Sequence, residues 1–314
     1  KPTQHSVKQL QELGVQPDIL VLRTEHELNA TILHKVALFC NVSKEAVIQS
    51  VDVPTIYEVP LKLQEQQMDS IVLNKFGLEA GETPEMKPWK KFLERKKNAM
   101  KEVRIGLVGK YVELQDAYKS IDESLLIASI YNDRKLNLRL IHSEKLNELN
   151  VESMLADLDG VVIAPGFGQR GVEGKLTAIR YVREHDIPCL GICLGMQCMV
   201  IEFARNVLGM EGANSTEMEP QTPFKVIDLM ENQKNVVNMG GTMRLGAYDC
   251  VLKKGSKLYQ AFGKELVQQR HRHRFEFNSE YKEAFEAAGM KCVGENPDTG
   301  LVEAVELPGL QWFV

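Results

Sequence analysis

The stretch Ile187-Pro-Cys-Leu-Gly-Ile-Cys193-Leu-Gly-Met-Gln197 decides the fold of this chain. It is a short apolar run that leads into a glycine-flanked cysteine, and a helical pattern at 196–207 follows at once. A nucleophile placed between a strand and a helix needs small neighbours, because the turn is tight and its backbone is strained. The stretch therefore predicts a nucleophile elbow that presents Cys193 at the edge of a sheet. There the helix N-terminus is expected to favour a thiolate.

Strand and helix patterns alternate on the N-terminal side of this elbow. Strand patterns occupy 104–108, 136–141 and 159–164, and helical patterns occupy 116–132, 146–158 and 174–185. Such alternation predicts an α/β fold whose open, mostly parallel sheet has helices on both faces. Ligands collect at the carboxyl ends of the strands in such sheets, which is where Pro165-Gly-Phe-Gly168 and Cys193 fall.

The chain divides into three parts by its composition. Residues 1–78 carry strand patterns at 18–22 and 46–51 and an amphipathic helix pattern at 27–41. Residues 79–102 are rich first in Gly, Pro and Glu and then in Lys, which is typical of a solvated helix or a linker. We therefore predict a first domain at 1–78, a charged linker at 79–102 and a second domain at 103–314.

The overall composition excludes several classes of protein. The chain has 314 residues, of which 44% are hydrophobic and 26% charged, and its net charge is −5. This mild acidity argues against nucleic-acid binding, and no run approaches the ~18 uncharged apolar residues of a membrane helix. The six cysteines show neither CxxC pairs nor a disulfide-framework spacing. They are expected to be reduced thiols of a cytoplasmic protein without a metal site, and all but Cys193 in the second domain are expected to pack as small hydrophobic residues.

Two backbone amides are candidates for an oxyanion hole beside Cys193. In such turns the residue after the nucleophile, here Leu194, supplies one donor. The strand that ends in Ala164-Pro-Gly-Phe-Gly168 exposes further amides, because glycine allows a positive φ and a close approach. Gly166 is the expected second donor, and a plain strand-to-helix turn is the alternative interpretation of this loop.

The stretch Gln268-Gln-Arg-His-Arg-His-Arg-Phe-Glu-Phe277 alternates arginine with histidine and then carries two aromatic residues. As an edge strand it would place His271 and His273 on one face and the three arginines on the other. We expect either an arginine that holds a substrate carboxylate by paired hydrogen bonds, or a solvated basic strand.

Gly106-Leu-Val-Gly-Lys110 lacks the P-loop spacing and predicts no phosphate site.

Nearly the whole chain resembles the CTP synthase family, from the late part of its synthetase domain into its class I glutamine amidotransferase domain. The matching phrases are Lys1-Pro-Thr-Gln-His-Ser-Val7, Pro17-Asp-Ile-Leu20, Ala37-Leu-Phe-Cys-Asn-Val42, Val108-Gly-Lys-Tyr-Val-Glu-Leu114, Asp116-Ala-Tyr-Lys-Ser120, Pro165-Gly-Phe-Gly-Gln-Arg-Gly171, Leu190-Gly-Ile-Cys-Leu-Gly-Met-Gln197, Gly212-Ala-Asn-Ser-Thr-Glu217, Gly240-Gly-Thr-Met-Arg-Leu-Gly246 and Arg270-His-Arg-His-Arg274. The elbow alone indicates only the amidotransferase superfamily, whereas the phrases together indicate this family.

The resemblance implies a carbon–nitrogen ligase with a division of labour. One domain hydrolyses glutamine, and the ammonia travels internally to a P-loop-type α/β synthetase domain. There ATP phosphorylates the 4-oxygen of UTP, and ammonia displaces the phosphate. The resemblance also implies Mg²⁺ as a cofactor, GTP as an allosteric activator, CTP as a feedback inhibitor, a homotetramer and a cytoplasmic location.

The resemblance also assigns roles to individual residues. Cys193 would attack the glutamine amide and form a γ-glutamyl thioester, with Gly166 and Leu194 holding the oxyanion. The glutamine-binding positions would be Gly166, Leu194, Gly195, Met196, Gln197, Glu217 and Arg274. Arg274 and Glu217 suit the α-carboxylate and the α-amine, respectively. The nucleotide-binding positions would be Lys1, Pro2, Thr3 and Gln4 in a loop for UTP and CTP, Lys35, and Val51, Asp52 and Val53 near the adenine of ATP.

The chain departs from the family pattern at both ends and in one loop. The resemblance places a His-Pro-Glu signature shortly beyond Val314, and the phosphate-binding loop and magnesium carboxylates before Lys1. A fragment of a longer protein, inactive by itself, is therefore expected. The loop after Pro165 has one glycine where many relatives have two. His142-Ser-Glu144, whose spacing is superficially similar to the signature, is expected to be a surface polar group.

Three alternative functions stay open at this point. The first is a cysteine hydrolase or chaperone-like protein on a related α/β fold, which would use the elbow without transferring ammonia. The second is a catalytically inactive interaction module, for example in filaments. The third is an amidotransferase that delivers ammonia to a different acceptor.

Overall fold

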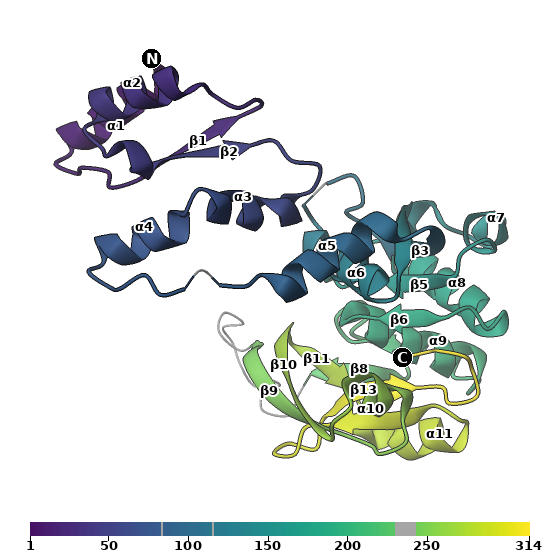
Figure 1. The fold of residues 1–314 in the computed structure, drawn as a ribbon. Coiled ribbons are helices and arrows are strands. Elements are labelled where there is room, and N and C mark those ends of the chain that lie inside the picture. The colour runs from purple at the N-terminus through teal and green to yellow at the C-terminus, as the bar shows by residue number, and fades with distance from the viewer. Residues whose placement is uncertain (83, 115, 230–242) are drawn as a thin grey trace. The chain divides into compact units, whose positions relative to one another are not determined.

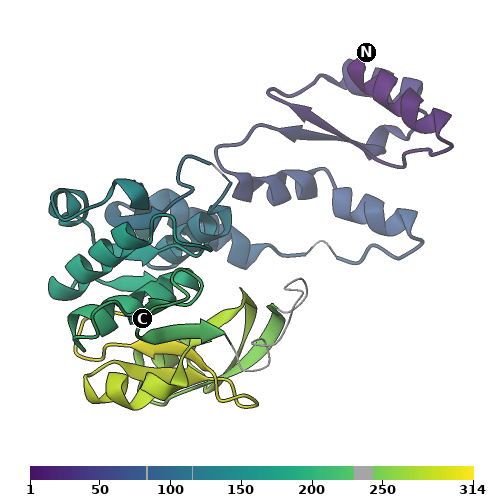
Figure 2. The same cartoon turned by 180° about the vertical axis from the view of Figure 1, so that it is seen from behind.

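The computed structural model describes residues 1–82, 84–114, 116–229 and 243–314. The chain forms two compact units, Lys1–Asn98 and Ala99–Val314, and each is described by itself (Figures 1 and 2). Residues 240–242, which begin one of the family-like phrases, lie outside the described residues.

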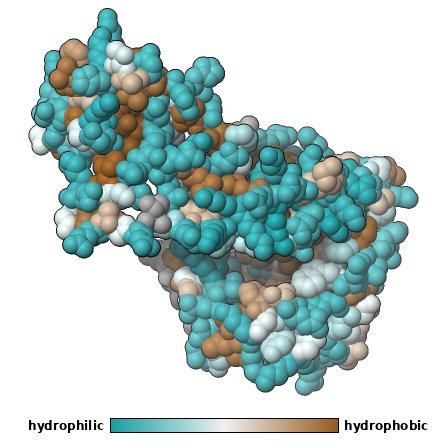
Figure 3. Space-filling view, viewed as in Figure 1, coloured by the Kyte–Doolittle hydropathy of each residue, from teal (hydrophilic) through white to brown (hydrophobic). Residues whose placement is uncertain are grey.

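The first unit is built around two parallel strands. In chain order its elements are α1 (Pro2–Glu12), β1 (Leu20–Thr24), α2 (Ala30–Cys40), η1 (Lys44–Ala46), β2 (Val47–Val51), η2 (Ile56–Glu58), α3 (Val59–Glu65), α4 (Met68–Lys75) and α5 (Lys87–Asn98). β1 pairs with β2 in parallel, which confirms both predicted strands, and α2 confirms the predicted helix. Its hydrophobic cluster is small, and large apolar side chains such as Leu13 and Phe39 are exposed, so that hydrophobic surface shows over this unit in Figure 3.

The charged segment 79–102 holds a helix that packs within the first unit. The indole of Trp89 on α5 donates a 2.7 Å hydrogen bond to the carbonyl of Tyr57, and the rings of Trp89 and Phe92 stack at 5.6 Å. Most basic residues of α5 are exposed, namely Lys87, Lys90, Lys91 and Lys97, whereas Arg95 and Lys96 are half-buried.

The second unit contains the predicted parallel sheet. β3 (Lys101–Gly109), β4 (Arg134–His142), β5 (Gly160–Ile163) and β6 (Cys189–Gly191) pair in parallel in the order β4-β3-β5-β6. The connecting helices are α6 (Lys119–Tyr131), α7 (Val151–Leu155), α8 (Val172–Glu184) and α9 (Leu194–Asn206). The predicted alternation of strands and helices over 104–207 is therefore confirmed.

Both faces of this sheet are covered by helices. Leu107 and Val162 face one way and pack with Leu125 of α6. Val161 and Ile163 face the other way and join the main core, which α7, α8 and α9 complete. Because successive residues of a strand point to opposite faces, four consecutive apolar residues in β5 serve two cores.

Two local predictions for this part of the chain are wrong. The helix expected over 146–158 is only five residues long, because Asn147 and Asn150 use their side chains to bond backbone amides in a turn. Ser143 is fully buried rather than on the surface, because Gly171 and Gly174 let α8 approach it closely.

The rest of the second unit is mainly antiparallel. One sheet has the order β10-β9-β12-β13, and another has the order β11-β8-β7. The elements are β7 (Asn214–Ser215), β8 (Lys225–Leu229), β9 (Arg244–Leu252), α10 (Lys257–Phe262), β10 (Leu266–His273), β11 (Phe275–Phe277), η5 (Ser279–Tyr281), α11 (Lys282–Ala287), β12 (Lys291–Glu295) and β13 (Val302–Glu306). β10 is an edge strand as predicted, but the predicted strand breaks at Arg274, and β11 joins the other sheet.

Candidate active site

Cys193 lies at a strained turn between β6 and α9. It is the residue that precedes α9, and its φ and ψ are 55° and −108°. A positive φ is costly for a residue with a side chain and is characteristic of a nucleophile elbow. A Cβ on Gly191 would overlap the sulfur of Met199, and a Cβ on Gly195 would overlap the carbonyl oxygen of Ile163. Both flanking glycines are therefore required by close packing, as the sequence predicts.

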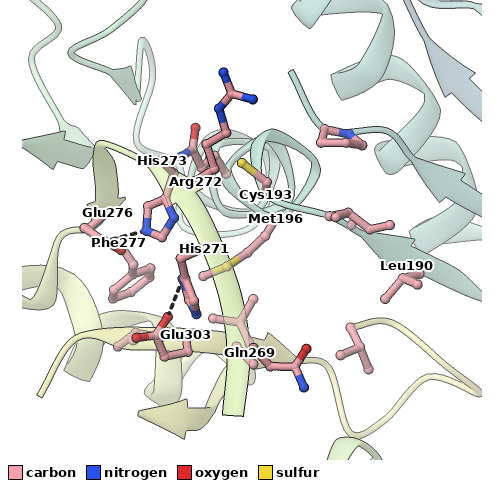
Figure 4. A pocket seen from close by; sticks show the side chains of 18 of the residues that line it. Leu190, Cys193, Met196, Gln269, His271, Arg272, His273, Glu276, Phe277 and Glu303 are labelled. Atoms are coloured by element: carbon pink, nitrogen blue, oxygen red, sulfur yellow. Dashed lines mark hydrogen bonds and ion pairs between the residues drawn. The ribbon is translucent and has the colours of Figure 1, made fainter. Parts of the chain in front are cut away.

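Cys193 opens into a pocket of about 520 Å³. Cys193 and Met196 line it from the elbow, and His271, Arg272 and His273 line it from β10 (Figure 4). The pocket is large enough for an amino-acid ligand and is mostly apolar on its far side, where α10 and β13 contribute. The other five cysteines are buried, as predicted for the four in this unit.

The electrostatic environment of Cys193 differs from the expected one. Burial raises the pKa of the Cys193 thiol above its usual value, and the backbone amide of Leu194 and the charge of Lys175 oppose this rise. The carboxylates of Glu217 and Glu276 raise the pKa further. The amide at the start of α9 thus favours the thiolate as predicted, but burial has the larger effect, and the net shift of the thiol pKa is upward.

Of the two amides predicted to form an oxyanion hole, one belongs to a residue that lines the pocket and the other to the residue that follows Cys193. Gly166 lines the pocket, and Leu194 is the first residue of α9, whose amide has no acceptor within its own helix. The α-carbon of Gly166 faces the side chain of Leu194 and the Cε of Lys110. Within the described residues neither amide donates to a backbone carbonyl, and the Leu194 amide interacts with the Cys193 sulfur.

The loop Pro165–Gly168, called the oxyanion loop after the role predicted for Gly166, is held by charged side chains at both ends. The Nζ of Lys175 donates to the carbonyl of Ala164 at 2.6 Å, immediately before the loop. The Nζ of Lys110 donates to the carbonyl of Phe167, and the amide of Gly168 donates to Oε1 of Glu217 at 2.7 Å. The backbone at the two ends of the loop is therefore fixed without any ligand.

The other residues predicted to bind glutamine fall into two groups. Met196 and Gln197 line the pocket, and Gly195 packs beneath the elbow. The Nε2 of Gln197 donates to the carbonyl of Phe275 at 3.0 Å, which fixes the side chain and leaves its Oε1 as an acceptor. Glu217 and Arg274 are half-buried but do not line the pocket, although His273 and Phe275 on either side of Arg274 do.

A buried charge network supports the β10 side of the pocket. Arg244 forms ion pairs with Glu276 at 3.4 Å and with Glu303 at 2.5 Å, and the Nε2 of His273 lies 2.7 Å from Oε1 of Glu276. The Nδ1 of His271 lies 3.5 Å from Glu303 (Figure 4). Burial and the charge of Arg244 nevertheless lower the pKa of His271 to about 4, because Arg244 already neutralises Glu303. His271 is therefore a neutral ring in the pocket wall.

The predicted nucleotide-binding residues lie on three elements of the first unit. Lys1, Pro2, Thr3 and Gln4 do not form the expected loop, because Pro2 is the first residue of α1 and its fixed φ suits that position. Lys35 is exposed on α2. Val51 ends β2, and Asp52 follows it in an ion pair with Arg23.

The described residues contain neither a candidate metal cluster nor a candidate membrane-spanning helix. No group of three or more His, Cys, Asp or Glu side chains there is arranged to hold a metal ion. No helix there is both long and apolar enough to cross a membrane.

Sequence reasoning missed three residues that support the site, Lys175, Arg244 and Glu276, of which Glu276 lines the pocket. Lys175 has a detectable signal, since it occupies a core-facing position of α8 beside Val172, Leu176 and Ile179. Glu276 and Arg244 have none, because their pairing depends on strands of different sheets.

Family models match two parts of the chain. The model described as "Glutamine amidotransferase class-I" matches residues 113–313, and the one described as "CTP synthase N-terminus" matches residues 1–78.

Named relatives cover the whole chain. A CTP synthase of Porphyromonas gingivalis is 70% identical and one of Bacteroides fragilis 63% identical, each over 314 residues. The chain spans 58% and 59% of their lengths, respectively. A solved structure described as the glutaminase domain of Trypanosoma brucei CTPS with bound acivicin is 36% identical, with a TM-score of 0.63. The match covers 67% of this chain and 83% of that one.

Proposed function

The chain belongs to the CTP synthase family, and from that premise we propose that the complete protein makes CTP from UTP. In this proposal glutamine supplies the nitrogen, and ATP supplies the phosphoryl group that activates the 4-oxygen of UTP. The protein would thus be a carbon–nitrogen ligase whose second unit, Ala99–Val314, releases ammonia from glutamine.

The observation that carries the glutaminase proposal is the strained backbone of Cys193 at a pocket that also contains Gly166. Once the thiol has lost its proton, the sulfur attacks the amide carbon and forms a C–S bond. The C–N bond then breaks, the nitrogen takes up a proton and leaves as ammonia, and water hydrolyses the γ-glutamyl thioester to glutamate. The amides of Gly166 and Leu194 would stabilise the negative oxygen of each tetrahedral intermediate.

Glutamine recognition would use groups on both sides of the elbow. The free Oε1 of Gln197 suits a donor on the substrate, and Gly195 and Met196 would contact its side chain. We assign the α-amine to Glu217 and the α-carboxylate to Arg274, since a zwitterion requires one anionic and one cationic partner. Neither residue is among those that line the pocket, so glutamine would have to draw their side chains inward.

The nucleotides would bind the first unit and the remainder of the synthetase domain. We propose that Lys1, Pro2, Thr3, Gln4 and Lys35 contact UTP or inhibitory CTP, and that Val51, Asp52 and Val53 lie near the adenine of ATP. Mg²⁺ would accompany ATP, but no described cluster in this chain fits a metal, and no step is assigned to one. Activation by GTP, a homotetrameric assembly and a cytoplasmic location complete the proposal.

The test is CTP formation by the full-length protein with either glutamine or ammonium chloride as the nitrogen source. Cys193→Ala should abolish the glutamine-dependent reaction and leave the ammonia-dependent reaction intact. Cys198→Ala, which alters a buried cysteine five residues further along the chain, is the matched control and should keep both reactions. Glutamine-dependent activity in Cys193→Ala would eliminate the proposed nucleophile, and failure of the wild type to use UTP would eliminate the proposed acceptor.

A further inference from the structure

Lys175 is a buried basic residue that the chemistry proposed above does not use. It belongs to the first turn of α8, and its side chain is 0% exposed. Gly174 beside it brings α8 into close contact with Ser143, which closes this side of the helix to solvent. A lysine is seldom buried so completely, because its ammonium group loses its hydration.

The ammonium group of Lys175 has one hydrogen-bond acceptor in the part of the chain that the structure describes. This acceptor is the carbonyl of Ala164 at 2.6 Å, and no carboxylate there lies within ion-pair distance of Nζ. A lysine kept for packing or stability would be expected to pair with an acidic side chain. Lys175 instead directs its charge at the residue from which the oxyanion loop begins.

The charge of Lys175 reaches the elbow. It lowers the pKa of the Cys193 thiol, against the two carboxylates that raise it. Burial in turn lowers the pKa of Lys175 itself, and the nearby thiols of Cys198 and Cys193 oppose that effect. Lys175 and Cys193 are thus electrostatic neighbours on adjacent elements, α8 and the start of α9.

We propose that Lys175 is a positioning residue of the glutaminase site, which anchors the start of the oxyanion loop and provides the positive charge behind Cys193 and the oxyanion. The inference rests on the proposed glutaminase function. Its two parts are separable, because the anchor needs only a hydrogen-bond donor whereas the electrostatic role needs a cation.

Three substitutions in the full-length protein separate these parts. Lys175→Met removes the donor and the charge, Lys175→Gln keeps a donor without the charge, and Lys175→Arg keeps both. Lys282→Met is the matched control, since Lys282 pairs with Glu295 at 2.6 Å and does not line the pocket. Ammonia-dependent CTP formation and thermal unfolding show whether each variant is folded.

The first readout is alkylation of Cys193 by iodoacetamide as a function of pH, quantified by peptide mass spectrometry without glutamine. Removing a nearby positive charge raises the pKa of the thiol, so the reaction should require a higher pH in Lys175→Met and Lys175→Gln. The profiles of Lys175→Arg and Lys282→Met should match the wild type. The other five cysteines are buried and should react slowly.

The second readout is glutamine hydrolysis. We expect kcat to fall by about tenfold or more in Lys175→Met, with a smaller change in KM, because the charge acts mainly on developing negative charge. Lys175→Arg should retain most of the activity. An unchanged alkylation profile in both uncharged variants would overturn the electrostatic role, and a Lys175→Met kcat within twofold of the wild type would overturn the positioning role.

The same experiment distinguishes failure of the inference from failure of the proposed function. If the wild type hydrolyses no glutamine although its alkylation profile depends on Lys175, the glutaminase proposal fails and the electrostatic role stands. If the wild type is active and every Lys175 variant equals it in both readouts, only the inference fails.

Discussion

The residues around Cys193 combine a strained backbone with tight packing. The positive φ of Cys193 is tolerated because α9 is pressed against β5, with the α-carbon of Gly195 over the carbonyl of Ile163. The same contact excludes every larger side chain at position 195. The strained turn at Cys193 and the close approach of α9 to β5 thus depend on each other.

We predict that Gly195→Ala displaces the elbow. The added methyl group must move backbone rather than a flexible side chain, so we expect a loss of about 2 kcal/mol or more in the free energy of unfolding. Glutamine-dependent activity should fall much more than ammonia-dependent activity. Gly309→Ala is the control, since Gly309 has open space around it and no positive φ. Equal stability of the two variants would contradict the packing argument.

His271 should make the second unit less stable at acidic pH. Its folded-state pKa of about 4 lies below its ordinary value of 6.5. Between these values the unfolded chain binds a proton that the folded protein does not, so stability present above pH 6.5 is lost as the pH falls toward 4. The loss attributable to His271 should be about 2–3 kcal/mol at pH 4.5.

The measurement is urea denaturation at pH 7 and pH 4.5. His271→Gln should show a smaller difference between the two pH values than the wild type, whereas His185→Gln, at an exposed ring, should match the wild type. An unchanged pH dependence in His271→Gln would mean that the imidazole is protonated when folded.

At the residue scale, sequence patterns predict the parts of the site that local geometry dictates. Gly191, Cys193 and Gly195 are such a case, because a strand-to-helix turn that exposes a nucleophile admits few sequences. The neutral state of His271 was not predictable, because it depends on Arg244, which is distant in sequence.

At the scale of elements, α8 and α9 are joined by a buried ion pair. Arg183 donates to Glu202 through Nε at 2.9 Å and through Nη2 at 2.8 Å. The Glu202 side chain is 0% exposed, so its charge depends on this partner. The pair thereby links the helix that carries Lys175 to the helix that begins at the elbow.

Arg183→Ala should be strongly destabilising, because it leaves Glu202 charged, buried and without its main partner. We expect a loss of about 3 kcal/mol in the free energy of unfolding, measured by urea denaturation. Arg180→Ala removes an exposed arginine of the same helix that pairs with Glu184, and should cost about 0.5 kcal/mol or less. If the two substitutions cost the same, the buried pair contributes no more than an exposed one.

Elements with strong periodicity, such as α8 and α9, were predicted to within two residues at each end. The errors arose where side chains compete with backbone hydrogen bonds, as at Asn147 and Asn150, or where a strand changes sheets, as at Arg274. Such events depend on tertiary partners, and hydrophobic periodicity carries no signal for them.

The whole molecule has two compact units. In the first unit, an exposed stretch within 79–86 precedes α5. The described residues of 79–86 belong to no helix or strand. A protease specific for glutamate should therefore cut first after Glu79, Glu82 or Glu85. Glu94 is equally exposed but lies inside α5, and should be cut much later. A time course by intact-mass spectrometry tests this, and early cleavage at Glu94 would contradict it.

The parallel half of the second unit was predictable because each strand and helix is adjacent to the next in sequence. The strand pairing of the antiparallel half was not predicted from the sequence. There β9 pairs with both β10 and β12, and β11 belongs to a different sheet. Pairings of this kind are set by side-chain packing among several strands, which no single stretch encodes.

Residues 312–314, at the far end of this sequence, form backbone hydrogen bonds with β6. The amide of Cys189 donates to the carbonyl of Trp312 at 2.8 Å, and that of Gly191 donates to Val314 at 2.9 Å. More than 120 residues separate these partners in the sequence. A ribosome that adds ~5–20 residues per second therefore synthesises Cys193 about 6–25 s before the residues that pair with β6. During synthesis the nascent chain therefore carries the Cys193 thiol beside a strand edge that its final neighbour has not yet covered. Such an uncovered edge can pair with another chain until residues 312–314 are in place.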